Sequence, residues 1–394
     1  PLDLNVNLLS FTVRSYNHKG VSFSGILCSL IVAHNQPMPP PIKLVASWDL
    51  EGTDTIIDVR SPSEFGIDHI PGAINLPVLS DREHAIVGKT HKDSHFDARK
   101  IGAAFVAANI SDHLNGPLRD KPNDFHPLIY CARGGQRSKA FALICAEVGW
   151  RCSVLEGGYK SYRKAVMSSL HEFAMRMKII KIAGRTGTGK TEIIGELCKQ
   201  GRNVIDLENL ARHRGSLLGA YPKEEQPSQK LFETLLWSHL KTLNPDQPVF
   251  VEAESSKIGR IQIPDTLWQV MKDSPQVMIL ANLQNRVQYL LNNYTELQRD
   301  PEILERLFQN FKRSGQTTLA QRCEDELSTG NWESLAEILL QSHYDKKYDR
   351  SIGHHGCDNI LAIELNELDD NNFKIAAKKI SEMCLGQIAD PPST

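Results

Sequence analysis

Twice along this chain, a short run of apolar residues leads through a glycine-rich loop into a helix, and this repeated order constrains the fold more than any other feature. The first instance runs from a strand predicted at 127–131 to a helix at 138–148, and the second from a strand at 178–183 to a helix at 191–200. Short apolar strands that alternate with helices are typical of parallel sheets. Further strands are predicted at 55–59, 72–77, 152–155, 203–207, 248–253 and 276–280. The sequence therefore predicts two α/β domains in succession.

The same pattern divides the chain into segments. Residues 1–42 end in the proline-rich run PMPPP and are expected to form a poorly structured extension. The first α/β domain is expected at 43–168, and the second at 169–388, with a polar helical part from 286 to about 342. Residues 389–394 are expected to be a disordered tail.

Composition narrows the classes of protein. The chain of 394 residues carries a net charge of −2, so any nucleic-acid site must be a local basic patch. Its eight cysteines are scattered without a C-x-x-C pair, which disfavours a zinc site or a disulfide framework and fits a reducing, cytoplasmic location. Runs of apolar residues are too short for a membrane-spanning helix. The apolar stretch at 22–33 fits a weak targeting segment or an upstream extension with Met38 as the natural start, and the cysteine pattern favours the extension.

The first glycine-rich loop reads CARGGQRS and begins at Cys131. Between a buried strand and a helix, such a loop points successive backbone N–H groups inward, where they bind anions and stabilise a thiolate. Its two glycines permit the tight curvature. Arg133 and Arg137 add positive charge for a bound oxyanion. The sequence therefore predicts a reactive thiolate at Cys131, with both arginines as its catalytic partners.

Segments on both sides of this loop resemble the rhodanese superfamily. They are Asp58-Val59-Arg60 with Glu64-Phe65, the run HIPGAINLP that starts at His69, and Gly157-Gly158-Tyr159. The resemblance covers roughly residues 44–165 and implies a rhodanese-like parallel-sheet domain. In that family the cysteine accepts sulfur or selenium as a persulfide or perselenide, so the resemblance implies this role for Cys131.

A cysteine phosphatase is an alternative for the same loop. Cys131 and Arg137 also satisfy the C-x5-R pattern of those enzymes, one group of which shares the rhodanese fold. The sequence leaves open whether Arg137 lies in the loop or opens the following helix.

The second glycine-rich loop reads GRTGTGKT and matches the pattern G-x4-G-K-[ST] between a predicted strand and a predicted helix. Its backbone N–H groups are expected to cradle a diphosphate, with the lysine on the outer oxygens and the last threonine available to Mg²⁺. Asp206 and Glu252, at the ends of later strands, are candidate acidic residues near such a metal, and whether a metal is required stays open. The predicted phosphate-binding residues are Gly184, Thr186, Gly187, Thr188, Gly189, Lys190 and Thr191.

The two domains together resemble the tRNA 2-selenouridine synthases over about residues 44–350. The segments that carry this resemblance are the cysteine loop, DLENLARHRGS from Asp206 onward, and EAESSKIG from Glu252 onward. The resemblance implies a transferase acting on wobble 2-thiouridine in the anticodon region of tRNA. Geranyl diphosphate would first geranylate the sulfur, and selenium from selenophosphate would then replace it through a perselenide on Cys131. Both compounds are co-substrates, no tightly bound organic cofactor is implied, and a monomer is expected.

Two further questions stay open from the sequence. Arg212, His213 and Arg214 follow a predicted strand and are candidates to bind tRNA phosphates. A nucleotide rivals geranyl diphosphate as the occupant of the phosphate loop, and a persulfide sulfurtransferase with an ATP-binding domain is the corresponding alternative function. A non-enzymatic phosphate-binding regulator is disfavoured, because Cys131 and Lys190 are both present.

Overall fold

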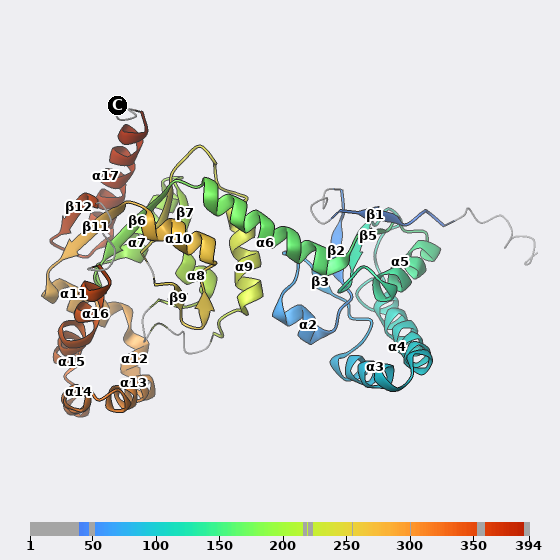
Figure 1. The fold of residues 1–394 in the computed structure, drawn as a ribbon, viewed down its shortest axis with the longest axis horizontal. Helices are drawn as coiled ribbons and strands as arrows, with labels where there is room; N and C mark the ends of the chain where they lie inside the picture. Colours follow the sequence, from blue (N-terminus) through green and yellow to red (C-terminus); the bar gives the residue numbers. More distant parts are fainter. Residues whose placement is uncertain are drawn as a thin grey trace, which may run out of the picture.

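Figure 1 shows two α/β domains joined by a long helix, α6 (Gly158–Arg176), which confirms the predicted fold class. The predicted boundary at residue 168 falls inside this helix. The computed structural model describes residues 39–46, 52–215, 219, 224–253, 255–299, 301–352 and 359–389. Most of the predicted N-terminal extension and residues 390–394 of the predicted tail lie outside the described residues. None of the described helices is long and apolar enough to cross a membrane.

The first domain is built on a parallel sheet with the strand order β1-β5-β4-β2-β3. The central strand β4 is buried along its whole length, because its sequence PLIY presents apolar side chains to both faces. Capping boxes begin α2, where Ser61 pairs with Glu64, and α3, where Ser80 pairs with Glu83. The elements are β1 (Lys43–Val45), β2 (Thr55–Asp58), α2 (Pro62–Ile67), β3 (Ile74–Asn75), α3 (Asp81–Asp93), α4 (His95–Asn115), β4 (Pro127–Tyr130), α5 (Gln136–Val148) and β5 (Ser153–Leu155).

The second domain has a parallel sheet with the order β12-β11-β6-β8-β7. Its central strand β6 is buried at every position, and even Lys181 within it satisfies its ammonium by donating to the Lys272 carbonyl at 3.1 Å. The elements up to the last central strand are β6 (Ile179–Gly184), α7 (Lys190–Lys199), β7 (Asn203–Ile205), α8 (Leu207–Ala211), α9 (Gln229–Leu240), β8 (Val249–Glu252), β9 (Lys257–Ile258), β10 (Ile261–Gln262), α10 (Asp265–Asp273) and β11 (Gln276–Ala281).

A helical part follows β11 and has a core of its own, centred on Leu304, Phe308 and Phe311. The chain then returns to the sheet, and Phe373 of the last helix packs into the core beside α7. The elements are α11 (Leu283–Asn293), α12 (Thr295–Arg299), α13 (Glu302–Arg313), α14 (Thr317–Thr329), α15 (Trp332–Leu339), the π-helical turn η2 (Leu340–Tyr344), α16 (Asp345–Ile352), β12 (Asn359–Leu365) and α17 (Asp370–Ala389).

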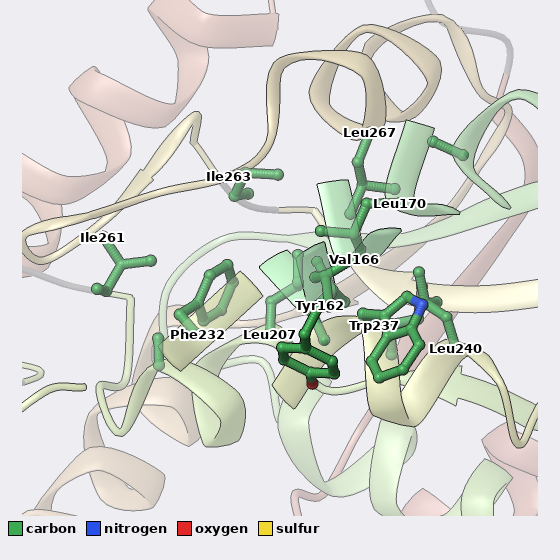
Figure 2. Packing of buried hydrophobic residues seen from close by; sticks show 14 of the residues in the cluster. Tyr162, Val166, Leu170, Leu207, Phe232, Trp237, Leu240, Ile261, Ile263 and Leu267 are labelled. Atoms are coloured by element: carbon green, nitrogen blue, oxygen red, sulfur yellow. The ribbon is translucent and has the colours of Figure 1, made fainter. Parts of the chain in front are cut away.

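The connecting helix α6 belongs to the cores of both domains. Figure 2 shows Tyr162, Val166 and Leu170 of this helix packed among side chains of the second domain. The ring of Tyr162 meets that of Trp237 on α9 edge to face, with centroids 5.6 Å apart. Because one continuous cluster of buried residues includes strands of both sheets, the two domains pack against each other through α6 and α9.

Candidate functional sites: a cysteine loop and a phosphate loop

Cys131 lies directly after β4, at the carboxyl end of the first sheet, and its residue is only 3% exposed. The loop turns back into α5, which begins at Gln136. Gly134 makes this turn possible, because it has a φ of +62° and a Cβ there would lie 2.8 Å from the Leu155 carbonyl oxygen. The predicted strand–loop–helix arrangement around the cysteine is therefore present.

The surroundings of Cys131 favour the thiolate over the thiol. Its Sγ lies 3.2 Å from the Oγ of the buried Ser138. Burial by itself raises the pKa of Cys131, but hydrogen bonds from the Ser138 hydroxyl and from backbone N–H groups of the loop outweigh it, so the pKa lies below the ordinary value. A thiolate at this position is a nucleophile held by fixed donors.

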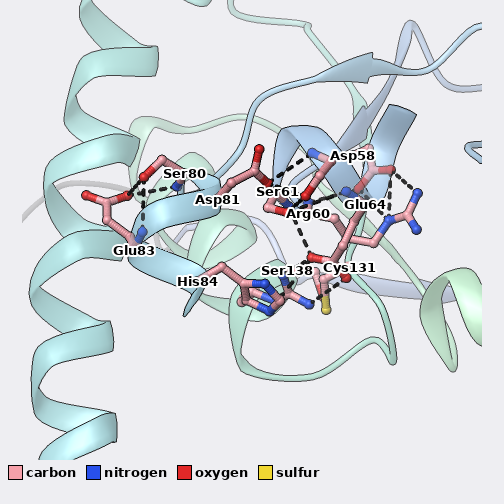
Figure 3. Close-up of polar contacts among 12 residues, drawn as sticks. Asp58, Arg60, Ser61, Glu64, Ser80, Asp81, Glu83, His84, Cys131 and Ser138 are labelled. Carbon is pink, nitrogen blue, oxygen red and sulfur yellow. Dashed lines mark hydrogen bonds and ion pairs between the residues drawn. The ribbon is translucent and has the colours of Figure 1, made fainter. Parts of the chain in front are cut away.

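The two arginines of the loop have different surroundings. Arg137 lies in the first turn of α5, and its Nη1 is 2.7 Å from Glu64 Oε2 on α2. Burial by itself would raise the pKa of Glu64. The hydrogen bond and the charge of Arg137 together outweigh this effect, so the pKa of Glu64 lies below its ordinary value. Arg137 therefore opens the helix and is paired, whereas Arg133 is exposed at the loop. Figure 3 shows these polar contacts around Cys131, Ser138 and Glu64.

The Gly157-Gly158 pair brings the start of α6 against the cysteine loop. A Cβ on Gly158 would lie 2.2 Å from the Cys131 carbonyl oxygen, so no side chain fits at that position. The backbone N–H of Tyr159 donates to the same carbonyl at 2.9 Å. The Tyr159 ring lies 4.0 Å from the guanidinium carbon of Arg60, which is buried and bonded to both carboxylate oxygens of Asp58. This packing fixes the back of the loop.

The phosphate loop connects β6 to α7 as predicted. Gly187 and Gly189 have φ values of +82° and +75°, in the region that favours glycine. A Cβ on Gly189 would lie 2.2 Å from the Phe373 ring, so α17 supports the loop from behind. Lys190 and Thr191 open α7, and the predicted phosphate-binding residues except Thr188 line one large cavity. Thr188 is buried and bonds the Arg185 carbonyl with its hydroxyl at 2.9 Å.

Of the two candidate acidic residues, Glu252 lies beside the loop. Its carboxylate oxygens are 3.5 Å from Lys190 Nζ and 3.3 Å from Thr191 Oγ1. Asp206 lines the same cavity but caps α8 by accepting from the Asn209 N–H at 2.9 Å. Burial raises the pKa of Asp206, which the Asn209 N–H and His239 only partly offset. Within the described part of the chain, three or more His, Cys, Asp or Glu side chains nowhere converge as a metal site.

The three residues predicted to bind tRNA phosphates lie in three different environments. Arg212 is exposed and adopts a left-handed conformation with φ +50°. His213 is buried, and this burial lowers its pKa. Arg214 lines the cavity of the phosphate loop, with its guanidinium carbon 4.5 Å from the centroid of the Tyr294 ring. This cavity is open to solvent and has a volume of about 800 Å³.

An apolar pocket that was not predicted from the sequence opens beside this cavity. It has a cavity volume of about 80 Å³ and lies within the helical part. Thr186, Leu290, Tyr294 and Tyr344 line both the pocket and the cavity, so the two are neighbours. The remaining lining residues are apolar, namely Leu291, Leu297, Leu304, Trp332, Leu335, Ala336, Leu339 and Leu340.

A buried ion pair ties the helical part to the phosphate loop. Arg286 on α11 is 2% exposed, and its guanidinium bonds Asp345 through two nitrogens, at 3.0 and 2.6 Å. Its Nε also donates to the Thr186 carbonyl of the loop at 2.8 Å. Arg185 pairs with Asp349 on α16 at 2.9 Å. These contacts hold the apolar pocket in a fixed position relative to the loop.

The fold and the two loops define a rhodanese-like domain joined to a P-loop domain. The model of the Rhodanese-like domain matches residues 45–165, and that of the tRNA 2-selenouridine synthase AAA domain matches residues 177–364. The chain is 32% identical to the tRNA 2-selenouridine synthase of Bdellovibrio bacteriovorus, over 74% of this chain and 87% of that protein. It is 34% identical to that of a Sulfurovum species, over 75% and 88%. The chain belongs to the tRNA 2-selenouridine synthase family.

Other relatives of this name match over a shorter length. The protein of Nitrosomonas europaea is 36% identical over 61% of this chain, and the match spans only 63% of that relative. Several relatives of this name are matched over less than two thirds of their own length.

Proposed function

We propose that this protein converts wobble 2-thiouridine in the anticodon region of tRNA to 2-selenouridine in two steps, geranylation of the sulfur followed by its replacement with selenium. Family membership supports the overall reaction. The two loops supply one site for each step, a phosphate loop for the prenyl donor and a thiolate for selenium. We further propose that one chain acts as a monomer.

In the first step, the 2-thio sulfur attacks the first carbon of geranyl diphosphate. A sulfur–carbon bond forms, the carbon–oxygen bond breaks, its electron pair leaves with the diphosphate, and the N3 proton of the base passes to water. The loop N–H groups and Lys190 hold the diphosphate. Thr191 and Glu252, whose oxygens lie 3.3 Å apart, would hold Mg²⁺, which would supply further positive charge to the leaving group.

The apolar pocket is the observation that carries the choice of geranyl diphosphate over a nucleotide. A nucleoside needs polar partners for its base and sugar, whereas this pocket offers almost only hydrocarbon beside the phosphate loop. The proposal places the diphosphate at Lys190 and the prenyl chain between α11 and α15.

In the second step, Cys131 carries selenium as a perselenide. The perselenide attacks C2 of the base, geranylthiolate leaves, and a thiol then cleaves the selenium–sulfur bond to release 2-selenouridine and a mixed disulfide on Cys131. Selenophosphate attacks that disulfide and expels the thiol, and water then removes phosphate to restore the perselenide. The cycle is therefore redox-neutral and needs a cellular thiol. The exposed Arg133 would steer the anionic donor by its charge.

The phosphatase alternative is disfavoured by the position of Arg137. A phosphatase of this kind needs that guanidinium on the phosphate, whereas here it is committed to Glu64 from within α5. The ATP-dependent sulfurtransferase is disfavoured by the apolar pocket.

Mass spectrometry of nucleosides, after incubation of tRNA with protein, geranyl diphosphate, selenophosphate and a thiol, tests both steps. Cys131→Ser should abolish 2-selenouridine and leave S-geranyl-2-thiouridine, and persistent selenation would remove the perselenide role.

Ala336→Trp fills the pocket and should weaken the binding of geranyl diphosphate about a hundredfold, while the binding of inorganic diphosphate is unchanged. Gln341→Trp, at an exposed position nearby, is the control. Tighter binding of ATP than of geranyl diphosphate would overturn the assignment of the loop.

A further inference from the structure

We propose that Arg214, seated on the ring of Tyr294, binds the diphosphate of the prenyl donor and stabilises it as it leaves. This inference rests on the proposed function and deepens it. It assigns a catalytic role to a residue that the sequence had grouped with tRNA-binding candidates.

The position of the pair is the first observation. Arg214 lines the cavity that also contains Lys190 and Thr191 of the phosphate loop. Tyr294 lines both this cavity and the apolar pocket. The guanidinium carbon of Arg214 is 4.5 Å from the centre of the Tyr294 ring. The pair therefore lies at the boundary between the polar and apolar spaces, where the diphosphate of a prenyl donor joins its carbon chain.

The charges in the cavity are the second observation. Lys190 forms an ion pair with Glu252, in which Nζ and Oε1 are 3.5 Å apart. Asp206 and Glu208 line the cavity as well, so carboxylates oppose a bound anion from more than one side. A diphosphate, which gains negative charge as its bond to carbon breaks, is stabilised by a further cation at this place.

The neighbouring basic residues do not share this position. Arg185, at the start of the phosphate loop, pairs with Asp349 at 2.9 Å. Arg212 is exposed, and His213 is buried beneath the turn at Gly259. Of the RHR triplet, Arg214 is the residue that lines the cavity.

The chemistry suits a guanidinium better than an ammonium. As the carbon–oxygen bond breaks, its electron pair moves to the diphosphate oxygen, and a planar guanidinium can donate two parallel N–H bonds to the phosphate oxygens. Tyr294 is a positioning residue, because its ring holds the guanidinium by a cation–π contact. No proton transfer is required of either side chain.

The test compares Arg214→Gln, Arg214→Lys and Arg212→Gln in the full chain. Calorimetry with inorganic diphosphate should show about tenfold weaker binding for Arg214→Gln and an intermediate loss for Arg214→Lys, which keeps the charge without the fork. Arg212→Gln, in the same loop, should bind diphosphate as the parent does. Single-turnover geranylation should slow by about 10²–10³-fold in Arg214→Gln, with tRNA affinity unchanged.

Tyr294 has its own readout. Tyr294→Phe keeps the ring and should retain the geranylation rate constant, whereas Tyr294→Leu should lower it at saturating geranyl diphosphate. An effect confined to KM would instead indicate a role in packing the prenyl chain and would remove the positioning role.

Two results would overturn the proposal for Arg214. One is parental diphosphate affinity and rate in Arg214→Gln, and the other is a loss of tRNA affinity in place of diphosphate affinity. Failure of the proposed function is distinguishable. In that case, the parent protein would bind inorganic diphosphate no more weakly than geranyl diphosphate and would form no geranylated nucleoside, whatever Arg214→Gln does.

Discussion

Replacing Ser138 by alanine isolates the contribution of one hydroxyl to the Cys131 thiolate. The Ser138 Oγ lies 3.2 Å from the sulfur, and the residue is fully buried, so water cannot take its place without rearrangement. A hydrogen bond to a charged group contributes about 1.5–3 kcal/mol, and one pKa unit corresponds to about 1.4 kcal/mol. The bond lowers the pKa by favouring the anion, so its loss should raise the pKa of Cys131 by an amount set by that lost hydrogen-bond energy.

The assay is the pH dependence of alkylation of Cys131 by iodoacetamide, followed by peptide mass spectrometry so that other cysteines do not contribute. The midpoint should move to higher pH in Ser138→Ala, with a slower reaction at neutral pH. Ser153→Ala is a matched control, because Ser153 is equally buried in the same domain and bonds His126 at 2.9 Å, away from the sulfur. An unchanged or lower midpoint in Ser138→Ala would refute the assignment of the hydroxyl as a main donor to the thiolate.

Three further predictions concern the loops and the tRNA. Gly158→Ala forces a Cβ against the Cys131 carbonyl and should lower stability by more than about 2 kcal/mol, seen as a lower Tm together with slower alkylation; an unchanged Tm would contradict the packing. Lys190→Ala should weaken geranyl diphosphate about tenfold in calorimetry, and parental affinity would show that the lysine does not reach the ligand. The affinity for tRNA should fall steeply with salt in filter binding, and a flat response would argue against phosphate contacts.

The parts of the fold that the sequence predicts are the buried ones. β4 and β6 appear as apolar runs because both faces of each strand are covered, and the glycine-rich loops behind them are local patterns. The edge strands β1 and β12 were not predicted from the sequence. β1 is three residues long and two of them are exposed, so it carries no apolar run. Its place in the sheet depends on pairing with β5, more than a hundred residues later.

The candidate sites divide in the same way. The phosphate loop is contiguous, so its residues could be named from the sequence. The partner of Arg137 could not, because Glu64 lies 73 residues earlier and the capping box of α2 brings it to α5. The apolar pocket is assembled from four α-helices and the π-helical turn η2, whose apolar residues look like ordinary core positions. A cavity left between such helices depends on their packing angles, which local periodicity does not specify.

The helix α6 forms a rigid connection between the two sites. α6 begins against the cysteine loop at Gly158 and ends just before β6, which leads into the phosphate loop. Beside it, the buried carboxylate of Asp68 accepts from Tyr159 at 2.6 Å and from Thr234 of the second domain at 3.1 Å. Rotating one domain about α6 would take the Thr234 hydroxyl away from that buried carboxylate, which is costly. Under the proposed function, a nucleoside that uses both sites would therefore move across the protein surface between them, since the packing of the domains opposes bringing the sites together.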